Sequence, residues 1–105
     1  MTKQRCFDVL QEILDRKRPI KRKIINKCMN MIEQMDLICW ISSTADGNIQ
    51  FEADFADSYI RLEVGLRTHQ FHITLKKETV SSFNLINVDE AIDVWNAFVE
   101  ISKYK

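Results

Sequence analysis

The first third of the chain has apolar residues at helical spacing. Residues 3–15 follow the i, i+4, i+7 pattern of an amphipathic helix. Its apolar face comprises Cys6, Phe7, Leu10, Ile13 and Leu14. Pro19 suits the first position of a second helix, since the first turn leaves that amide unpaired. We expect this helix to run to about Met35. Its apolar stripe comprises Ile20, Ile24, Cys28, Met31, Ile32 and Met35.

After Asp36 the apolar period changes from helical to two, which predicts β-strands. The predicted strands cover residues 37–44, 49–55, 59–66 and 69–76, with a weaker one between 80 and 86. One face is apolar, and the residues expected to be covered are Ile49, Phe51, Ala53, Phe55, Ile60, Leu62, Val64, Leu66, His69, Phe71, Ile73 and Leu75. One-sided alternation in consecutive strands favours an antiparallel meander with one covered face.

The last helix has the clearest predicted start. Asn87, followed three residues later by Glu90, resembles a capping box. The helix after it should lie across the covered face of the sheet. We therefore predict one α+β domain over residues 1–105, with N-terminal helices, an antiparallel meander of three to five strands, and a C-terminal helix packed on one face of the sheet.

Composition narrows the class of protein. Hydrophobic residues make up 46% of the chain, charged residues 29%, and the formal net charge is zero. These values argue against disorder of the whole chain. The only two glycines, Gly47 and Gly65, are too far apart for a phosphate-binding glycine loop. The apolar runs are too short to cross a membrane, and the start does not resemble a signal peptide, so we expect a cytoplasmic protein that makes no membrane contact.

The sequence offers few parts of a catalytic site. Cys6, Cys28 and Cys39 lack the spacing of a zinc site or a disulfide framework, so we expect buried free thiols, no metal and no cofactor. His69 and His72 should point to opposite faces of one strand and cannot share a metal. We expect His69 to be a structural, hydrogen-bonded histidine. No serine has a glycine-flanked elbow, and we predict that the protein is not an enzyme.

The zero net charge hides a split along the chain. Residues 1–35 hold nine Lys and Arg against four Asp and Glu, a charge of +5, and residues 36–105 hold six against eleven, a charge of −5. Many of the acids fall on the uncovered side of the predicted sheet, where Tyr59 and Trp40 are aromatic anchors. We predict a partner-binding face formed by Gln50, Glu52, Asp54, Asp57, Tyr59, Arg61, Glu63 and His72.

A basic segment lies between the two N-terminal helices. Six of the eight residues from 16 to 23 are cations, namely Arg16, Lys17, Arg18, Lys21, Arg22 and Lys23. Cations in the first turn of a helix oppose the helix dipole, and such local conflicts often mark function. Two interpretations stay open, a site for phosphates or an acidic protein surface, and a merely solvated corner between helices.

Two stretches together resemble a known pattern. Pro19-Ile20 opens a helix that ends near Met35, and Asp46-Gly47-Asn48-Ile49-Gln50-Phe51-Glu52 precedes the strand that starts at Tyr59. Over residues 19–66 the chain resembles small uncharacterised bacterial and mobile-element α+β proteins with a helix followed by a D-G-x-I-x-x-E hairpin. In outline it is similar to small phage-encoded inhibitors such as anti-CRISPR proteins. The resemblance implies no catalytic residues.

Three functions follow as hypotheses. The leading one is a small non-enzymatic inhibitor that binds a partner protein and blocks its functional surface. Phage anti-defence proteins, immunity proteins and antitoxins are forms of it, and a nuclease or nucleic-acid-binding complex is a candidate partner. The second is a nucleic-acid-binding module that uses residues 16–23. The third is an assembly subunit such as a homodimer, because Val94, Ala97 and Ile101 widen the apolar stripe of the last helix.

Overall fold

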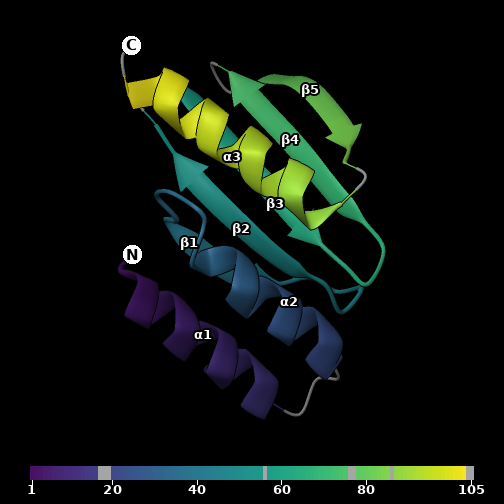
Figure 1. The fold of residues 1–105 in the computed structure, drawn as a ribbon. Helices are drawn as coiled ribbons and strands as arrows, with labels where there is room; N and C mark the ends of the chain where they lie inside the picture. The colour runs from purple at the N-terminus through teal and green to yellow at the C-terminus, as the bar shows by residue number, and fades with distance from the viewer. Residues whose placement is uncertain (17–19, 56, 76–77, 86, 104–105) are drawn as a thin grey trace.

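The computed structural model describes residues 1–16, 20–55, 57–75, 78–85 and 87–103. Over these residues the chain forms an α+β fold with two N-terminal helices, a five-stranded sheet and a C-terminal helix (Figure 1). The elements are α1 (Lys3–Asp15), α2 (Arg22–Ile32), β1 (Trp40–Ser43), β2 (Ile49–Asp54), β3 (Ser58–Val64), β4 (His69–Leu75), β5 (Glu78–Asn84) and α3 (Val88–Lys103). The predicted fold class is confirmed.

The sheet is a simple antiparallel meander. Its strand order is β1-β2-β3-β4-β5, so each strand pairs with its neighbours in the sequence. All three helices lie on one face of it, where α2 packs on β2, α3 packs on β3 and β4, and α1 packs on α2 and β1 (Figure 1). The opposite face carries no helix. This one-sided covering agrees with the predicted alternation of the strands.

The core fills the space between the helices and the sheet. Each layer contributes side chains that are fully or almost fully buried, among them Leu10, Ile25, Met31, Phe51, Leu62, Phe71 and Trp95. The ring of Trp95 meets that of Phe71 edge-on, with centroids 6.4 Å apart. Trp95 Nε1 also donates a hydrogen bond of 2.6 Å to the Asp36 carbonyl oxygen, which ties α3 to the segment before β1.

Helices α1 and α3 each start with a side chain that accepts an N-capping hydrogen bond. Thr2 Oγ1 accepts a hydrogen bond of 3.1 Å from Arg5 N at the start of α1. Asn87 Oδ1 accepts one of 2.9 Å from Glu90 N at the start of α3, as its position in the sequence predicts. At α2 the N-cap is Lys21, which makes no side-chain capping hydrogen bond.

Several predicted boundaries and orientations were wrong. The second helix starts at Arg22, because Lys21 has an extended backbone, and it ends at Ile32, before Met35; Pro19 lies outside the described residues. The first strand starts at Trp40 and not at Leu37, because Leu37 has a positive φ of 46°, which is incompatible with a strand. Leu66 is 41% exposed, since β3 ends at Val64 and the chain has already entered a turn.

Candidate functional site

The sheet face without helices brings most of the predicted binding residues together. Strand register aligns one residue from each strand in a row across the sheet. This row is Trp40, Glu52, Arg61, His72 and Ser82. A second row is Ser42, Gln50, Glu63, Gln70 and Asn84. Asp54 and Tyr59 face each other in a third row, and Asp57 is exposed just before β3. We call this surface the open face.

Hydrogen bonds hold several of these side chains in place. Glu52 Oε1 accepts from the Tyr59 hydroxyl and, at 2.9 Å, from Gln50 Nε2. Glu63 Oε2 accepts a bond of 3.0 Å from Asn48 Nδ2. Burial, together with the hydrogen bond to the nearby Glu52 carboxylate, raises the pKa of Tyr59 well above its usual value. Tyr59 therefore stays a neutral donor, and the open face is organised before any partner arrives.

Arg61 lies at the centre of the five-residue row. Its Nε is buried and has no hydrogen-bond partner among the described residues. It is flanked by Glu52 on β2 and His72 on β4. Burial and the Arg61 cation lower the pKa of His72, while Glu63 opposes this shift. His72 is therefore a neutral, half-buried imidazole near pH 7.

A contact that residue patterns could not predict joins β4 and β5 on this face. Ser82 Oγ and His72 Nδ1 form a hydrogen bond. A serine beside a histidine is the first part of a nucleophilic site, but the histidine must then accept a proton and become a cation. Arg61 beside His72 opposes that charge. The pair fits a polar contact on a binding surface better than a nucleophile and its base.

Trp40 adds an apolar element at the β1 edge of the open face. Its side chain is 52% exposed, and it faces Glu52 across the strand pair. Leu37, at the turn before β1, is 46% exposed. Tryptophan is strongly enriched among the residues that dominate binding energy at protein interfaces. Trp40 therefore provides an aromatic anchor for a partner protein at the β1 edge of the open face.

The open face carries an excess of negative charge. Among its described residues Glu52, Asp54, Asp57 and Glu63 are acidic and Arg61 is basic, which leaves a charge of −3 when His72 is neutral. A surface of this kind attracts a basic partner and speeds its encounter.

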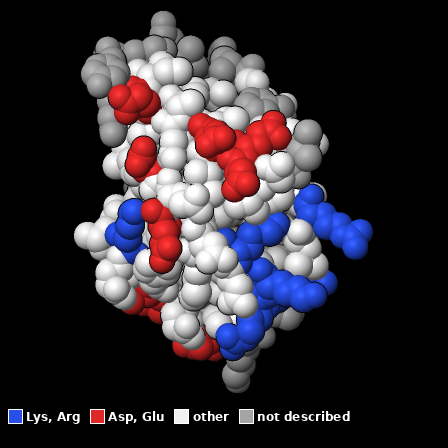
Figure 2. Space-filling model, viewed as in Figure 1, with Lys and Arg blue, Asp and Glu red and all other residues white. Residues whose placement is uncertain are grey.

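The predicted basic segment lies on the other side of the molecule. Arg16 is exposed just after α1, Lys17 and Arg18 fall outside the described residues, and Lys21, Arg22 and Lys23 are exposed at the start of α2. Figure 2, which views the helices in front of the sheet, shows basic side chains gathered on the side where α2 begins and acidic side chains over α3.

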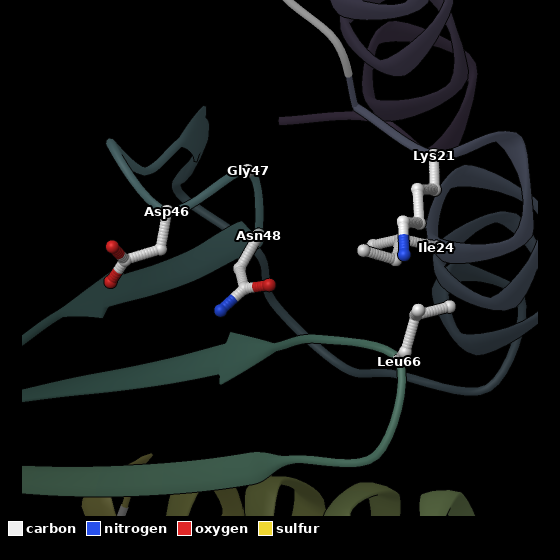
Figure 3. Close-up of a pocket in the computed structure, with 6 residues that line it drawn as sticks. All are labelled: Lys21, Ile24, Asp46, Gly47, Asn48 and Leu66. Atoms are coloured by element: carbon white, nitrogen blue, oxygen red, sulfur yellow. The ribbon is translucent and has the colours of Figure 1, made fainter.

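A shallow pocket of about 180 Å³ opens beside these cations. It lies between the start of α2, the β1–β2 turn and the β3–β4 turn, and its lining is Lys21, Ile24, Asp46, Gly47, Asn48 and Leu66. Figure 3 shows the Lys21 side chain reaching from α2 toward Ile24 and Leu66, with the Asp46 carboxylate directed away from it. Gly47 has a φ of 83°, which permits the tight β1–β2 turn.

Lys27 fastens the β3–β4 turn to α2. Its Nζ donates to the carbonyl oxygens of Gly65 at 2.8 Å and Leu66 at 3.1 Å, and lies 3.0 Å from His69 Nε2. His69 is 4% exposed, which confirms the predicted inward histidine with a hydrogen-bonded role. Burial, and then the Lys27 cation, lower the pKa of His69. The neutral ring accepts from Lys27 at Nε2.

The predicted burial of the cysteines is confirmed for two of the three. Cys6 and Cys28 are buried free thiols, but Cys39 is only half-buried. Among the described residues no group of three His, Cys, Asp or Glu is arranged to hold a metal ion. Within the same part of the chain, no helix combines the length and the apolar character of a membrane span. On α3, Val94 packs against the core, while Ala97 and Ile101 are exposed.

Comparison with known proteins returns no match: no family model, no curated protein and no solved structure matches this chain.

Proposed function

We propose that the protein is a small non-enzymatic inhibitor that docks its open face on a basic surface of a partner protein and so blocks that surface. The observation that carries the proposal is the aligned row of Trp40, Glu52, Arg61, His72 and Ser82, which crosses all five strands. Its side chains combine an exposed aromatic anchor, Trp40, with a carboxylate, Glu52, that is held in place by hydrogen bonds. Phage anti-defence proteins, immunity proteins and antitoxins are forms that such an inhibitor takes.

The charge of the open face sets the chemistry of the partner. A net charge of −3 on one flat surface matches a patch rich in Lys and Arg, as in a nuclease or another protein that binds nucleic acid. Blocking such a patch would exclude the nucleic acid itself. The resemblance in outline to small phage-encoded inhibitors supports the same proposal only as an analogy of fold.

Charge reversal on the open face tests the proposal. Asp54 and Asp57 are exposed, so Asp54→Lys with Asp57→Lys should leave the fold intact. The matched control is Asp93→Lys with Glu100→Lys, which makes the same charge change at exposed positions of α3 on the helical side. Immobilised wild type, open-face variant and control are each used to capture proteins from a lysate of the native host. We expect a protein that wild type and control retain and the open-face variant loses.

Capture alone does not complete the test. The captured protein is purified, and its affinity for nucleic acid is measured with and without added wild type. We expect wild type to lower that affinity and Trp40→Ala to weaken complex formation by about 2 kcal/mol or more, as for an interface anchor. Equal capture by the open-face variant and the control, or a captured protein that keeps its full nucleic-acid affinity, contradicts the proposal.

A further inference from the structure

The basic residues near the pocket come from two parts of the chain that the fold brings together. Lys21 and Leu66 line the same pocket, although 45 positions separate them in the sequence. Arg67 follows Leu66 directly and is exposed in the β3–β4 turn. The start of α2 and the turn that carries Arg67 therefore lie beside one pocket.

Helical spacing decides which cations of α2 face the turn. Residues four apart lie on the same side of a helix, so Lys23 shares a side with Lys27. Lys27 is the residue that bonds to Gly65 and Leu66, which shows that this side of α2 faces the β3–β4 turn. Arg22, one position before Lys23, is turned by about 100° away from it. The surface is thus bordered by Lys21, Lys23 and Arg67, which we call the basic cleft residues.

Lys27 gives this arrangement a defined geometry. It holds the turn with two hydrogen bonds to carbonyl oxygens, and a third contact joins it to His69. A Cβ on Gly65 would lie 2.6 Å from Thr68 Oγ1 and 2.8 Å from Asn48 Oδ1, so the same turn also packs against the β1–β2 turn. The turn that carries Arg67 is therefore held close to α2. Figure 2 shows that basic side chains dominate this side of the molecule.

We propose that Lys21, Lys23 and Arg67 form a docking surface for the phosphodiester backbone of a nucleic acid. Lys21 and Leu66 line a shallow pocket between α2 and the β3–β4 turn, and Lys23 and Arg67 are exposed on these two elements (Figure 3). A chain of phosphates fits three separated cations better than a single small anion does. The surface lies at the end of the sheet where α2 begins, and none of its three cations belongs to the open face, so this inference does not depend on the proposed inhibitor function.

The positions of these cations also conflict with the stability of α2. Lys21 is its N-cap without a capping hydrogen bond, and no acidic residue occupies the first turn. Each cation there lowers helix stability through the helix dipole. A bound phosphate backbone would relieve this repulsion. Ligand binding thus accounts for cations that the stability of α2 does not explain.

The salt dependence of binding tests the surface directly. Affinity for a short fluorescein-labelled DNA duplex is measured by anisotropy at several salt concentrations. Each neutralised phosphate contributes a slope of about −0.9 to log K against log salt, so three cations predict about −2 to −3. We expect Lys23→Gln and Arg67→Gln each to reduce this slope by about 1. The effect of Arg67→Gln is decisive, because the basic segment of the sequence does not include it.

The matched control is Lys3→Gln, the same charge change on an exposed lysine of α1. Lys3 Nζ bonds to the Glu33 carbonyl oxygen, at the far end of α2 and so about 15 Å along the helix from Lys23. We expect its slope to equal that of wild type. We also expect Asp46→Asn to strengthen binding, since it removes a carboxylate from the pocket lining.

Three outcomes would overturn the inference. They are no binding of the duplex at low salt, an unchanged slope in Arg67→Gln, and an equal loss of slope in Lys3→Gln and Lys23→Gln. The last would show an attraction to positive charge anywhere on the molecule. Circular dichroism of each variant confirms that the helices are retained, so a lost slope reports the surface and not unfolding.

Discussion

The two faces of the sheet are built by alternate residues of the same strands, yet different interactions hold their side chains in place. Ile49, Phe51 and Ala53 on β2 are fully buried against the helices. Gln50 and Glu52, between them in the sequence, are half-buried on the open face and joined by a hydrogen bond of 2.9 Å. The covered face depends on apolar area removed from water, and the open face on directed polar contacts.

Because of this difference, we expect the covered face to determine the stability of the fold and the open face to determine what the protein binds. Burial has no preferred direction, so the covered face tolerates changes of detail but not loss of volume. A hydrogen bond exposed to water contributes little net stability, because water competes for both partners. Changes on the covered face should therefore unfold the protein, while changes on the open face should leave it folded and alter what it binds. Four measurements examine this contrast.

Phe51→Ala should have the largest effect. Phe51 is fully buried on the covered face, and such a truncation costs about 3–5 kcal/mol. Gln50→Ala, one position earlier on the open face, should cost less than about 1.5 kcal/mol. Urea denaturation followed by circular dichroism measures both free energies of unfolding. Similar losses for the two variants would refute the assignment of stability to the covered face.

Gly65→Ala should cost about 1–3 kcal/mol, as overpacking of a dense site does. Its Cβ would lie 2.6 Å from Thr68 Oγ1 and 2.8 Å from Asn48 Oδ1, so one of them must move. Asn48 also donates to Glu63 on the open face, so the disturbance reaches both faces. The double variant Gly65→Ala with Thr68→Gly should regain part of the loss. No recovery would show that the contact with Thr68 is not the cause.

Acid should weaken the fold through His69. Its pKa in the folded protein is below the ordinary value of 6.5, so the unfolded chain takes up the proton first as pH falls. The free energy of unfolding should therefore be fully present above pH 6.5 and decrease as pH falls through the lowered pKa. His69→Gln should flatten this decrease, because it removes the group whose pKa is lowered in the folded protein. An unchanged pH profile in His69→Gln would contradict this.

Tyr59→Phe should have the smallest effect at neutral pH. It removes one hydrogen bond to Glu52 on the open face, worth about 0.5–1.5 kcal/mol. The pKa of Tyr59 is raised above its ordinary value of 10, so its stabilising effect should be lost as pH rises beyond 10. Alkaline titration of tyrosine absorbance in wild type and Tyr59→Phe identifies its phenolate. Ionisation near pH 10 would mean that Glu52 and burial do not act on this hydroxyl.

Much of the fold could be predicted from residue patterns. Period-two alternation identified the meander and its covered face, and Asn87 marked the start of α3, because burial and capping act over a few neighbouring residues. The start of β1 was missed because the positive φ of Leu37 leaves no mark in a leucine. Leu66 was misplaced because alternation does not reveal where a strand ends.

The candidate surfaces needed more than these patterns. Residue patterns alone show which residues of each strand share a face, and that the N-terminal third is basic while the rest is acidic. The packing of distant elements brings His72 to Ser82, Lys27 to His69, and the β3–β4 turn to α2 through the bond from Lys27 to Leu66. Residue patterns and tertiary contacts act over different distances along the chain. Local patterns encode which side chains avoid water, whereas strand register and helix docking decide which distant polar groups meet.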